Sequence, residues 1–273
     1  MQKVAYLGLP GSYSHIAGKN YFSGKAEFIS CETFEDIFNA IDKGEATLGV
    51  LPLENSLSGS IYQSYDLLMD KSLKIIGEVV LKIRHCLYAK GSGKIKRCFS
   101  HPEVFKQCRN YFKKNPHIEQ IFVGDTSRAA LMLSKSGTNN DSAIGAISLG
   151  DLYGVKLIER DIQDNPNNYT RFVIVGKKMN KTGTKVSLVF SIEHKPGSLF
   201  KTLEPYSRLG LNLMKIESRP LFGKPWEYIF CVDFVLNGQK DNLDTMLSEM
   251  KEHVNFITVL GLYEKGRIYD DSG

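Results

Sequence analysis

The sequence predicts an α/β protein in two parts, a larger α/β domain followed by a small βαββαβ domain. Three observations lead to this prediction. Short β-rich runs alternate with amphipathic segments over the first 175 or so residues, one long extended run interrupts them at 73–90, and the pattern changes after the polar segment at 179–184.

The strand predictions for the larger domain rest on apolar and β-branched runs of strand length. Amphipathic segments separate most of these runs, which favours mostly parallel strands joined by helices. The expected strands are VAYLGL, AEFIS, TLGVLPL, KRCFS, EQIFVG, SAIGAIS, VKLIERDI and TRFVIVG.

The run LKIIGEVVLKIRHCLYAK contains no helical period, so we expect it to cross from one lobe to another. If the chain returns near residue 160, lobe one comprises about 1–78 plus 160–178, and lobe two about 79–159. A ligand would then bind in the cleft between these lobes.

The second domain is expected over 185–264, after the linker MNKTGT. Its strands and helices follow the ferredoxin-like order βαββαβ. The segments are KVSLVFSI, SLFKTLEPYSRL, NLMKIESRP, WEYIFCVDFVL, KDNLDTMLSEMKEHV and NFITVLGLY.

Composition excludes several classes of protein. A chain of 273 residues with 42% apolar residues is globular, and its longest apolar runs are too short to cross a bilayer. The start, MQKVAYLG, enters a strand pattern at once and leaves no room for a signal peptide, so we expect a cytoplasmic protein. The net charge of +5 is spread over the surface and suits small anionic ligands better than nucleic acid.

The five cysteines are odd in number and scattered, which indicates reduced thiols and not a disulfide scaffold. Cys98, His101 and Cys108 lie close enough to suggest zinc. A structural zinc site needs about four ligands, however, and no second pair of ligands follows. We therefore expect no metal.

Hydroxyl residues mark the junctions where predicted strands lead into helices. Such junctions favour anions, because helix N-termini carry free backbone N–H groups. Any one of them is better explained as an ordinary helix cap, but four such junctions together with Thr170 and Arg171 favour a binding site. The segments are GLPGSYSHIA, LPLENSLSGSIYQSY, SHPEVFKQC, with a capping-box spacing from Ser100 to Glu103, and GDTSRAALML, capped at Asp125 or Thr126.

Two further groups of polar residues stand out. Asn55 and Ser56 follow an apolar strand in ENS, where they either contact a ligand or form an Asx turn. Thr170 and Arg171 open the apolar run TRFVIVG, and no acidic residue adjoins this arginine in the sequence. Since a buried charge needs a partner, an anionic ligand is one candidate and a salt bridge is the other.

Together these motifs resemble those of the prephenate dehydratase family, and 185–264 resembles its regulatory ACT domain. The matches occur in the family's order over nearly the whole chain. They are VAYLGLPGSYS, LPLENSLSGSI, SHPEVFKQC, DTSRAA, AIGAIS, YGVKLIERDIQD with NNYTRF, HKPGSLF and KIESRP. The resemblance implies a two-lobed, periplasmic-binding-protein-like catalytic domain over 1–178 and an ACT domain over 185–264.

The implied reaction is the decarboxylating dehydration of prephenate to phenylpyruvate in L-phenylalanine biosynthesis, without a cofactor. Thr170 would donate a hydrogen bond or proton to the leaving hydroxyl, and Arg171 would hold a carboxylate. The remaining substrate-binding residues implied by motif position are Ser12, Asn55, Ser56, Thr126, Ser127 and Phe172. His101 either supports the residues that contact the substrate, without contacting it itself, or caps a helix.

The resemblance also implies feedback regulation by L-phenylalanine at an interface between two ACT domains, within a homodimer or homotetramer. The alternative is that this domain only dimerises. The implied effector site comprises Gly197, Ser198, Leu199, Asn212, Leu213, Glu217 and Ser218. Ser198 replaces the alanine of the family's GAL motif, which would alter affinity.

Two other functions stay open. The GLPGSYS opening and DTSRAA also resemble relatives that accept arogenate, and Ser127 could bear on that choice. A non-catalytic amino-acid sensor is the alternative from another class, because a two-lobed cleft also serves in solute binding. With no chorismate mutase segment ahead of VAYLG, we expect a single catalytic activity.

Overall fold

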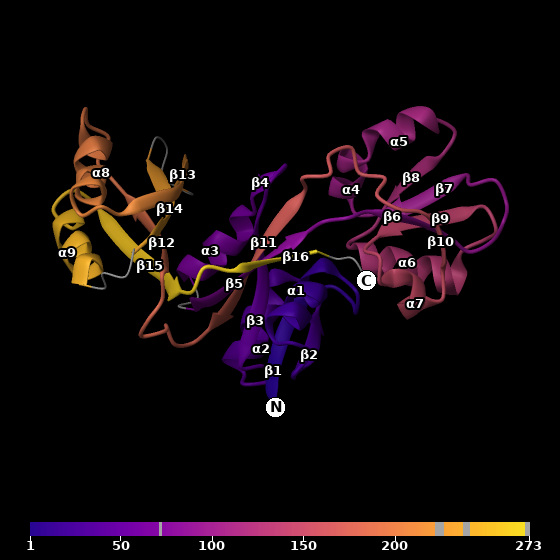
Figure 1. Ribbon diagram of the computed structural model, residues 1–273, viewed down its shortest axis with the longest axis horizontal. Coiled ribbons are helices and arrows are strands. Elements are labelled where there is room, and N and C mark those ends of the chain that lie inside the picture. Colours follow the sequence, from indigo (N-terminus) through magenta and orange to yellow (C-terminus); the bar gives the residue numbers. More distant parts are fainter. Residues whose placement is uncertain (71–72, 222–226, 237–240, 271–273) are drawn as a thin grey trace. The chain divides into compact units, whose positions relative to one another are not determined.

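The structure is a computed structural model that describes residues 1–70, 73–221, 227–236 and 241–270 (Figure 1). The chain divides into two compact units, one formed by Met1–Leu67, Val79–Ile174 and Arg267–Gly273, the other by Leu68–Glu78 and Val175–Gly266. This division differs from the expected bounds in placing Leu68–Glu78 with the C-terminal unit and the last strand with the N-terminal one. The α/β fold class is confirmed.

In the first unit, one sheet has the strand order β11-β3-β1-β2, with β5 beside β11. Parallel pairing joins β1 to both β2 and β3, and α1 and α2 pack against β1 and β3. The strands are β1 (Gln2–Leu7), β2 (Ala26–Cys31), β3 (Leu48–Asn55), β4 (Gly59–Ser60), β5 (Lys74–Lys82) and β11 (Tyr169–Gly176). The helices are α1 (Tyr13–Tyr21), α2 (Phe34–Asp42) and α3 (Tyr62–Asp70).

The second sheet of this unit has the order β10-β6-β9-β7-β8. Helices α4 and α5 lie on one of its faces, and α6 and α7 on the other (Figure 1). Its strands are β6 (Cys86–Ala89), β7 (Arg97–Ser100), β8 (Glu119–Phe122), β9 (Asp141–Gly145) and β10 (Lys156–Glu159). Its helices are α4 (Pro102–Gln107), α5 (Arg109–Lys114), α6 (Thr126–Ser136) and α7 (Leu149–Tyr153).

The chain passes from the first sheet to the second between β5 and β6 and returns after β10. The two passing segments are joined by backbone hydrogen bonds, from Ile83 N to Asn168 O at 2.8 Å and from Ile162 N to His85 O at 3.0 Å. His85 and Asn168 are thereby held in one place, and both side chains are buried. The two sheets are thus joined by a hydrogen-bonded pair of extended segments, next to the pocket described below.

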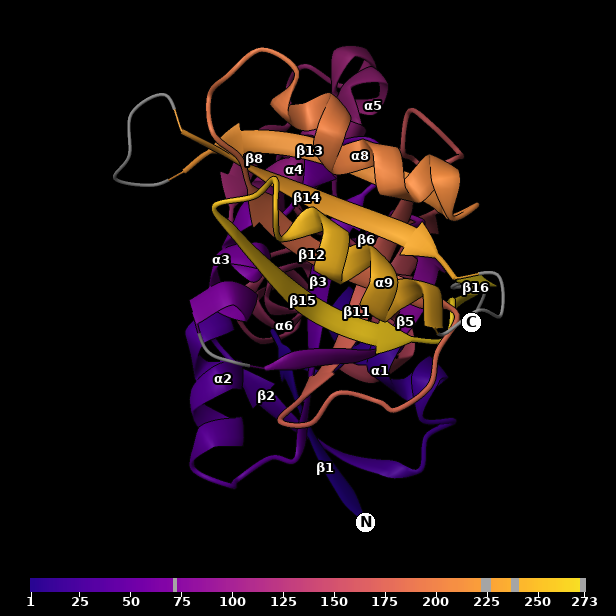
Figure 2. The same ribbon diagram turned by 90° about the vertical axis from the view of Figure 1, so that its left-hand side faces the viewer.

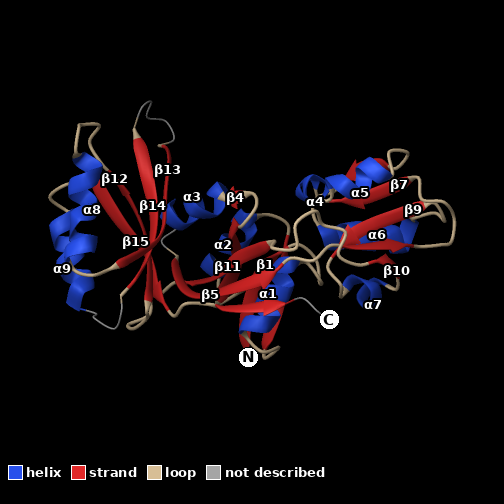
Figure 3. Cartoon of the chain, turned by 45° about the horizontal axis from the view of Figure 1, so that its top comes forward, coloured by secondary structure: helices blue, strands red, loops and turns tan. Residues whose placement is uncertain are grey.

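The second unit contains a four-stranded antiparallel sheet in the order β13-β14-β12-β15, with α8 and α9 over one face (Figures 2 and 3). Its elements are β12 (Lys185–Ser191), α8 (Ser198–Arg208), β13 (Asn212–Pro220), β14 (Tyr228–Val235), α9 (Asp241–Met250) and β15 (Phe256–Tyr263). This is the ferredoxin-like βαββαβ order. Val186, Leu188, Phe190 and Phe234 form the centre of its core.

Neither the two-residue strand β4 nor the last strand was expected from the sequence. Strand β16 (Arg267–Asp270) pairs in parallel with Val79–Lys82 of β5. Asp270 also lies 3.6 Å from Arg84 and 3.7 Å from Lys82. A four-residue run of mixed polarity after the last predicted strand carries too little periodicity to be identified from the sequence.

All five cysteines are buried and none forms a disulfide. Within the described ranges, no helix is long and apolar enough to cross a membrane, and no group of three or more His, Cys, Asp or Glu side chains could hold a metal ion.

A buried carboxylate in the second sheet, Asp141, accepts a bidentate pair of hydrogen bonds from Arg97, at 2.8 and 2.9 Å. Asp141 also accepts from the backbone N–H and the hydroxyl of Thr138. Burial disfavours this carboxylate, but the hydrogen bonds from Arg97 and Thr138 outweigh the effect and lower the pKa of Asp141 below its ordinary value.

We expect Asp141→Asn to lower the free energy of unfolding by about 1–3 kcal/mol at neutral pH, measured by urea denaturation, because charged hydrogen bonds are lost. A lowered folded-state pKa contributes stability above the unfolded pKa and loses it as the pH falls. The difference in the free energy of unfolding between wild type and variant should therefore become smaller as the pH falls. Glu159→Gln, an exposed carboxylate on β10, should change stability by less than about 0.5 kcal/mol. A difference that stays constant down to low pH would contradict this account.

Candidate active site

A pocket of about 260 Å³ lies in the first unit, where strand ends and helix N-termini converge. Its wall is mixed, with apolar side chains and a small number of polar groups, as is usual for sites that bind small molecules. Its lining includes Leu7, Ser12, Tyr13, Asn55, Ile83, His85, His101, Glu103, Gln107, Asp125, Thr126, Thr170 and Phe172.

Thr170 lies in this pocket at the start of β11, with only 8% of its surface exposed. Asn55, at the end of β3, donates from Nδ2 to the Thr170 hydroxyl at 2.9 Å. The Thr170 oxygen is therefore an acceptor in this bond, and its own proton has no acceptor among the residues that the structure describes. That proton is available to a ligand in the pocket.

The side-chain oxygen of Asn55 is held by hydrogen bonds from the backbone. Its Oδ1 accepts from Leu57 N at 2.9 Å and Ser58 N at 3.0 Å, so the expected Asx turn is present. Its Nδ2 also reaches Asn168 Oδ1 at 2.8 Å. The sequence analysis left open whether Asn55 forms a turn or lines a site, and in the structure it does both.

Four residues in or beside this wall were not singled out from the sequence. Tyr13, His85 and Gln107 line the pocket, and Asn168 hydrogen-bonds to lining residues. Asn168 donates to Gln107 Oε1 at 2.8 Å, and the same oxygen lies 2.8 Å from His85 Nε2. His85 Nδ1 lies 2.9 Å from the hydroxyl of Tyr13. The sequence did contain one signal for this network, the histidine inside the apolar run IRHCLYA, because a buried imidazole needs polar partners.

Ser12, Thr126 and Phe172 line the pocket, in agreement with the positions expected of them. Ser12 caps α1, since its hydroxyl accepts from His15 N and donates to Leu7 O. Thr126 is the first residue of α6, so two helix N-termini open onto the pocket. Free N–H groups at such ends favour an anion.

Ser56 and Ser127 lie outside the lining. Ser56 joins β3 to the segment before β11, donating to Asn167 O and accepting from Tyr169 N. Ser127 is fully buried and contacts Asp125 Oδ1 at 2.7 Å and Leu9 O at 3.2 Å. Both hydroxyls are thus occupied in holding the loops that carry the lining residues.

Arg171 points away from the pocket, because alternate residues of a strand face opposite sides and its neighbours Thr170 and Phe172 line it. Its guanidinium lies 3.4 Å from Glu54 of β3. An acidic partner therefore exists in space although none adjoins Arg171 in the sequence, and its burial does not require an anionic ligand. The role of Arg171 as a carboxylate clamp stays a prediction.

Helix capping around the pocket differs from the expectation at one helix. His101, and not Ser100, caps α4, with Nδ1 accepting from Glu103 N at 3.2 Å. Ser100 instead donates to Ile144 O at 2.9 Å. At α6 the cap is Asp125, which accepts from Arg128 N.

Both histidines of the pocket are neutral near pH 7. Burial lowers the pKa of His101 below its ordinary value and that of His85 to about 4. The pocket's ionisable groups at neutral pH are then the carboxylates Glu103 and Asp125. Neither histidine is poised to carry a positive charge for substrate binding.

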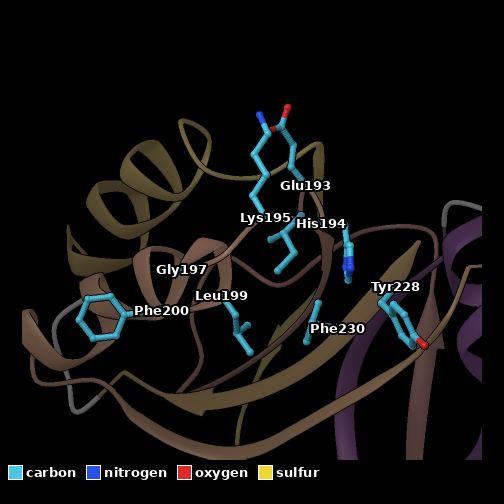
Figure 4. A pocket seen from close by; sticks show the side chains of 9 residues that line it. Glu193, His194, Lys195, Gly197, Leu199, Phe200, Tyr228 and Phe230 are labelled. Carbon is cyan, nitrogen blue, oxygen red and sulfur yellow. The ribbon is translucent and has the colours of Figure 1, made fainter. Parts of the chain in front are cut away.

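A second pocket, of about 300 Å³, lies in the small unit around the loop between β12 and α8 (Figure 4). Gly197 and Leu199 of the expected effector site line it. Gly197 has a backbone φ of +83°, which lies in the left-handed region that favours glycine. The other lining residues are Ile192, Glu193, His194, Lys195, Phe200, Tyr228 and Phe230.

The remaining residues of the expected effector site lie elsewhere in this unit. Ser198 begins α8 beside the pocket, whereas Asn212, Leu213, Glu217 and Ser218 belong to β13, at the edge of the sheet. The structure therefore brings only Gly197 and Leu199 into one pocket.

A family model described as prephenate dehydratase matches residues 4–180. The chain belongs to the prephenate dehydratase family. This match covers the whole pocket of the first unit, including Thr170 and Asn55, and it ends before β12. Proteins of the family are dehydratases, which are carbon–oxygen lyases.

Two relatives illustrate the range of this family. The chain is 37% identical to prephenate dehydratase of Methanocaldococcus jannaschii, over 96% of this chain and 98% of that protein. It is also 37% identical to arogenate dehydratase 2 of Petunia hybrida, over 96% of this chain and 71% of that protein.

Solved structures resemble the whole chain. Prephenate dehydratase from Arthrobacter aurescens, in complex with L-Phe, has a TM-score of 0.85 at 26% identity, over 96% of this chain and 90% of the other. A structure named GqqA and described as a novel type of quorum quenching acylase has a TM-score of 0.84 at 27% identity, over 96% of this chain and 97% of the other.

We expect Asn55→Asp to reduce dehydratase turnover at least about tenfold and to lower the free energy of unfolding by about 1–3 kcal/mol. A carboxylate can still accept from Leu57 and Ser58 but cannot donate to Thr170 or Asn168. Steady-state kinetics and urea denaturation measure the two effects. Asn39→Asp, on the exposed face of α2, is the matched control and should leave turnover and the free energy of unfolding nearly unchanged. Wild-type turnover in Asn55→Asp would contradict the assigned direction of these hydrogen bonds.

Proposed function

We propose that this protein catalyses the decarboxylating dehydration of prephenate to phenylpyruvate, with Thr170 as the catalytic hydrogen-bond donor. The observation that carries this proposal is the Thr170 hydroxyl, which accepts from Asn55 and keeps its proton for a ligand in the pocket. The full-length match to dehydratases supports the substrate class.

The reaction requires little from the protein apart from orientation and help for the leaving group. The electrons of the bond to the ring carboxylate move into the ring as CO2 leaves, and the ring hydroxyl departs with its bonding pair. Aromatisation of the ring provides the driving force. A donor placed at the departing oxygen stabilises the negative charge that develops there, and water completes the proton transfer.

The two carboxylates of prephenate would lie against backbone N–H donors. The carboxylate of Asp125 also lies at one of these helix ends, where it accepts from Arg128 N and the Ser127 hydroxyl. The N-termini of α1 and α6 open onto the pocket, at Ser12 and Thr126. Their free N–H groups and dipoles are suited to carboxylates. We therefore assign carboxylate binding to these two helix ends.

Arogenate is a second candidate substrate, and a specific observation favours testing it. Arogenate carries an ammonium group, and the carboxylates Glu103 and Asp125 line the pocket. Ser127, expected near the substrate side chain, instead hydrogen-bonds Asp125 and would act only through it. The plant relative named as an arogenate dehydratase agrees with this possibility.

The decisive assay follows phenylpyruvate and phenylalanine formation from prephenate and from arogenate. Thr170→Val keeps the shape of the side chain but removes the donor, so we expect kcat to fall by about 10²–10³-fold on the preferred substrate. Thr170→Ser keeps a hydroxyl and should retain most of the rate. Full turnover in Thr170→Val would refute the role of Thr170.

No turnover of either substrate by the wild type would overturn the proposed reaction. It would favour the non-catalytic sensor, or another activity on the same fold, such as the acylase activity named for one structural neighbour.

For the small unit we propose an ACT regulatory domain that binds L-phenylalanine and inhibits the enzyme, with domain bounds of 1–178 and 185–264. The βαββαβ order supports this assignment, as does the solved relative in complex with L-Phe. The edge strand β13 exposes Met214 and Ile216, which supports association of two copies as a homodimer or homotetramer. Feedback inhibition then couples two distinct sites.

L-Phenylalanine should bind the full-length protein in calorimetry and depress its turnover. Gly197→Val should weaken that binding at least about tenfold, because a β-branched residue strongly disfavours the positive φ found there. Gly210→Val has a similar positive φ at the end of α8 and lies outside the pocket, so it controls for backbone strain. Equal binding by Gly197→Val and wild type would contradict the assigned site.

A further inference from the structure

A continuous chain of hydrogen bonds runs along the pocket wall from Thr170 to His85. The steps join Thr170 to Asn55, Asn55 to Asn168, Asn168 to Gln107 and Gln107 to His85, at 2.9, 2.8, 2.8 and 2.8 Å. His85 is 1% exposed and lies where the chain passes from the first sheet to the second.

The direction of this chain is set at Asn55. Leu57 N and Ser58 N are backbone groups that can only donate, so the atom of Asn55 facing them is the carbonyl oxygen. The amide nitrogen of Asn55 then faces Asn168 and must meet an acceptor, Oδ1. The nitrogen of Asn168 consequently faces Gln107.

The same logic fixes the next two groups. Because Asn168 donates, the atom of Gln107 that receives it is Oε1, which also faces His85. An oxygen acceptor there requires His85 to donate from Nε2. The neutral ring is then unprotonated at Nδ1, where the hydroxyl of Tyr13 lies 2.9 Å away. That hydroxyl also lies 2.7 Å from Arg84 O, so its one proton is shared between these two acceptors. Burial keeps the ring neutral, since it lowers the pKa of His85 to about 4.

We propose that His85 is a positioning residue for the dehydration, which fixes the amide of Gln107 through its Nε2–H so that the Gln107 NH₂ group faces the substrate. This inference rests on the proposed function. It adds a residue that never contacts the reacting atoms and acts only through Gln107.

The arrangement at Gln107 supports the proposal. Its Oε1 accepts from both His85 and Asn168, and its Nε2 has no acceptor among the residues that the structure describes. Gln107 lines the pocket, so this NH₂ group is a donor for a substrate oxygen. Without the His85 donor, Asn168 alone would hold the Gln107 oxygen, so the amide would rotate more readily and its carbonyl oxygen could then face an anionic substrate.

Two substitutions separate positioning from acid–base chemistry. In His85→Gln the new amide nitrogen lies about where Nε2 lies in histidine, so it can still donate to Gln107. In His85→Asn the shorter amide reaches only the Nδ1 position, and the donor to Gln107 is lost. Thermal unfolding of both variants establishes that they fold, and His117→Asn, at an exposed histidine, is the matched control.

We expect His85→Asn to lose about ten- to a hundredfold in kcat/KM, since a buried acceptor loses a partner, and His85→Gln to recover most of that loss. An acid–base role predicts instead that both variants are equally impaired, because neither amide exchanges protons. That result, or wild-type kcat/KM in His85→Asn, would overturn the proposal.

A second measurement does not depend on turnover. Nitrogen-15 chemical shifts of the His85 ring in the folded full-length protein distinguish a protonated from an unprotonated ring nitrogen. We expect protonated Nε2 and unprotonated Nδ1 near pH 7, with the His85→Gln spectrum assigning the resonance by its absence. A protonated Nδ1 with a bare Nε2 would overturn the proposal even if the protein dehydrates prephenate, whereas inactivity of the wild type on both substrates would refute only the reaction.

Discussion

The site depends on one constraint, the pair of backbone N–H groups at Leu57 and Ser58 that hold the carbonyl oxygen of Asn55. A side-chain amide can usually rotate to exchange its oxygen and nitrogen, but two obligate donors remove that freedom here. The nitrogen of Asn55 is thereby directed at Thr170. The orientation of the Thr170 hydroxyl is thus set by a turn in the main chain, and no charged group is needed to set it.

The same constraint explains why the pocket is built at the junction of two sheets. Asn55 comes from the first sheet and Gln107 from a helix on the second, and Asn168 lies on the segment that returns between them. A buried polar network of this kind is costly unless every group has a partner. Every partner in this sequence of bonds is a neutral group, so no buried charge has to be compensated, and the NH₂ group of Gln107 is the one amide group left facing the pocket among the described residues of this network.

Much of the fold followed from local pattern, and the reasons for the exceptions are physical. Runs such as TRFVIVG and SAIGAIS are apolar enough to identify as strands, and the βαββαβ order of the small unit follows from its periodicity. The partner of Arg171 did not follow, because Glu54 becomes its neighbour only when β3 and β11 pair. The helix cap expected at Ser100 was wrong for a similar reason, since its hydroxyl bonds Ile144 O, which is remote in sequence. The part expected of Ser127 in substrate binding stays a prediction.

The C-terminal strand has a consequence for how the molecule can be dissected. After the small unit the chain returns to the first unit and adds β16 to β5, and the small unit itself includes Leu68–Glu78 from the N-terminal third of the sequence. Neither unit is a single uninterrupted stretch of the gene. A fragment that stops at the last strand of the small unit would leave the backbone of Val79–Lys82 without its edge partner. A fragment that starts at 185 would lack Glu78, whose carboxylate lies 2.6 Å from the buried Lys185. Recombination or truncation at either of these points therefore removes part of a compact unit that is assembled from segments distant in sequence.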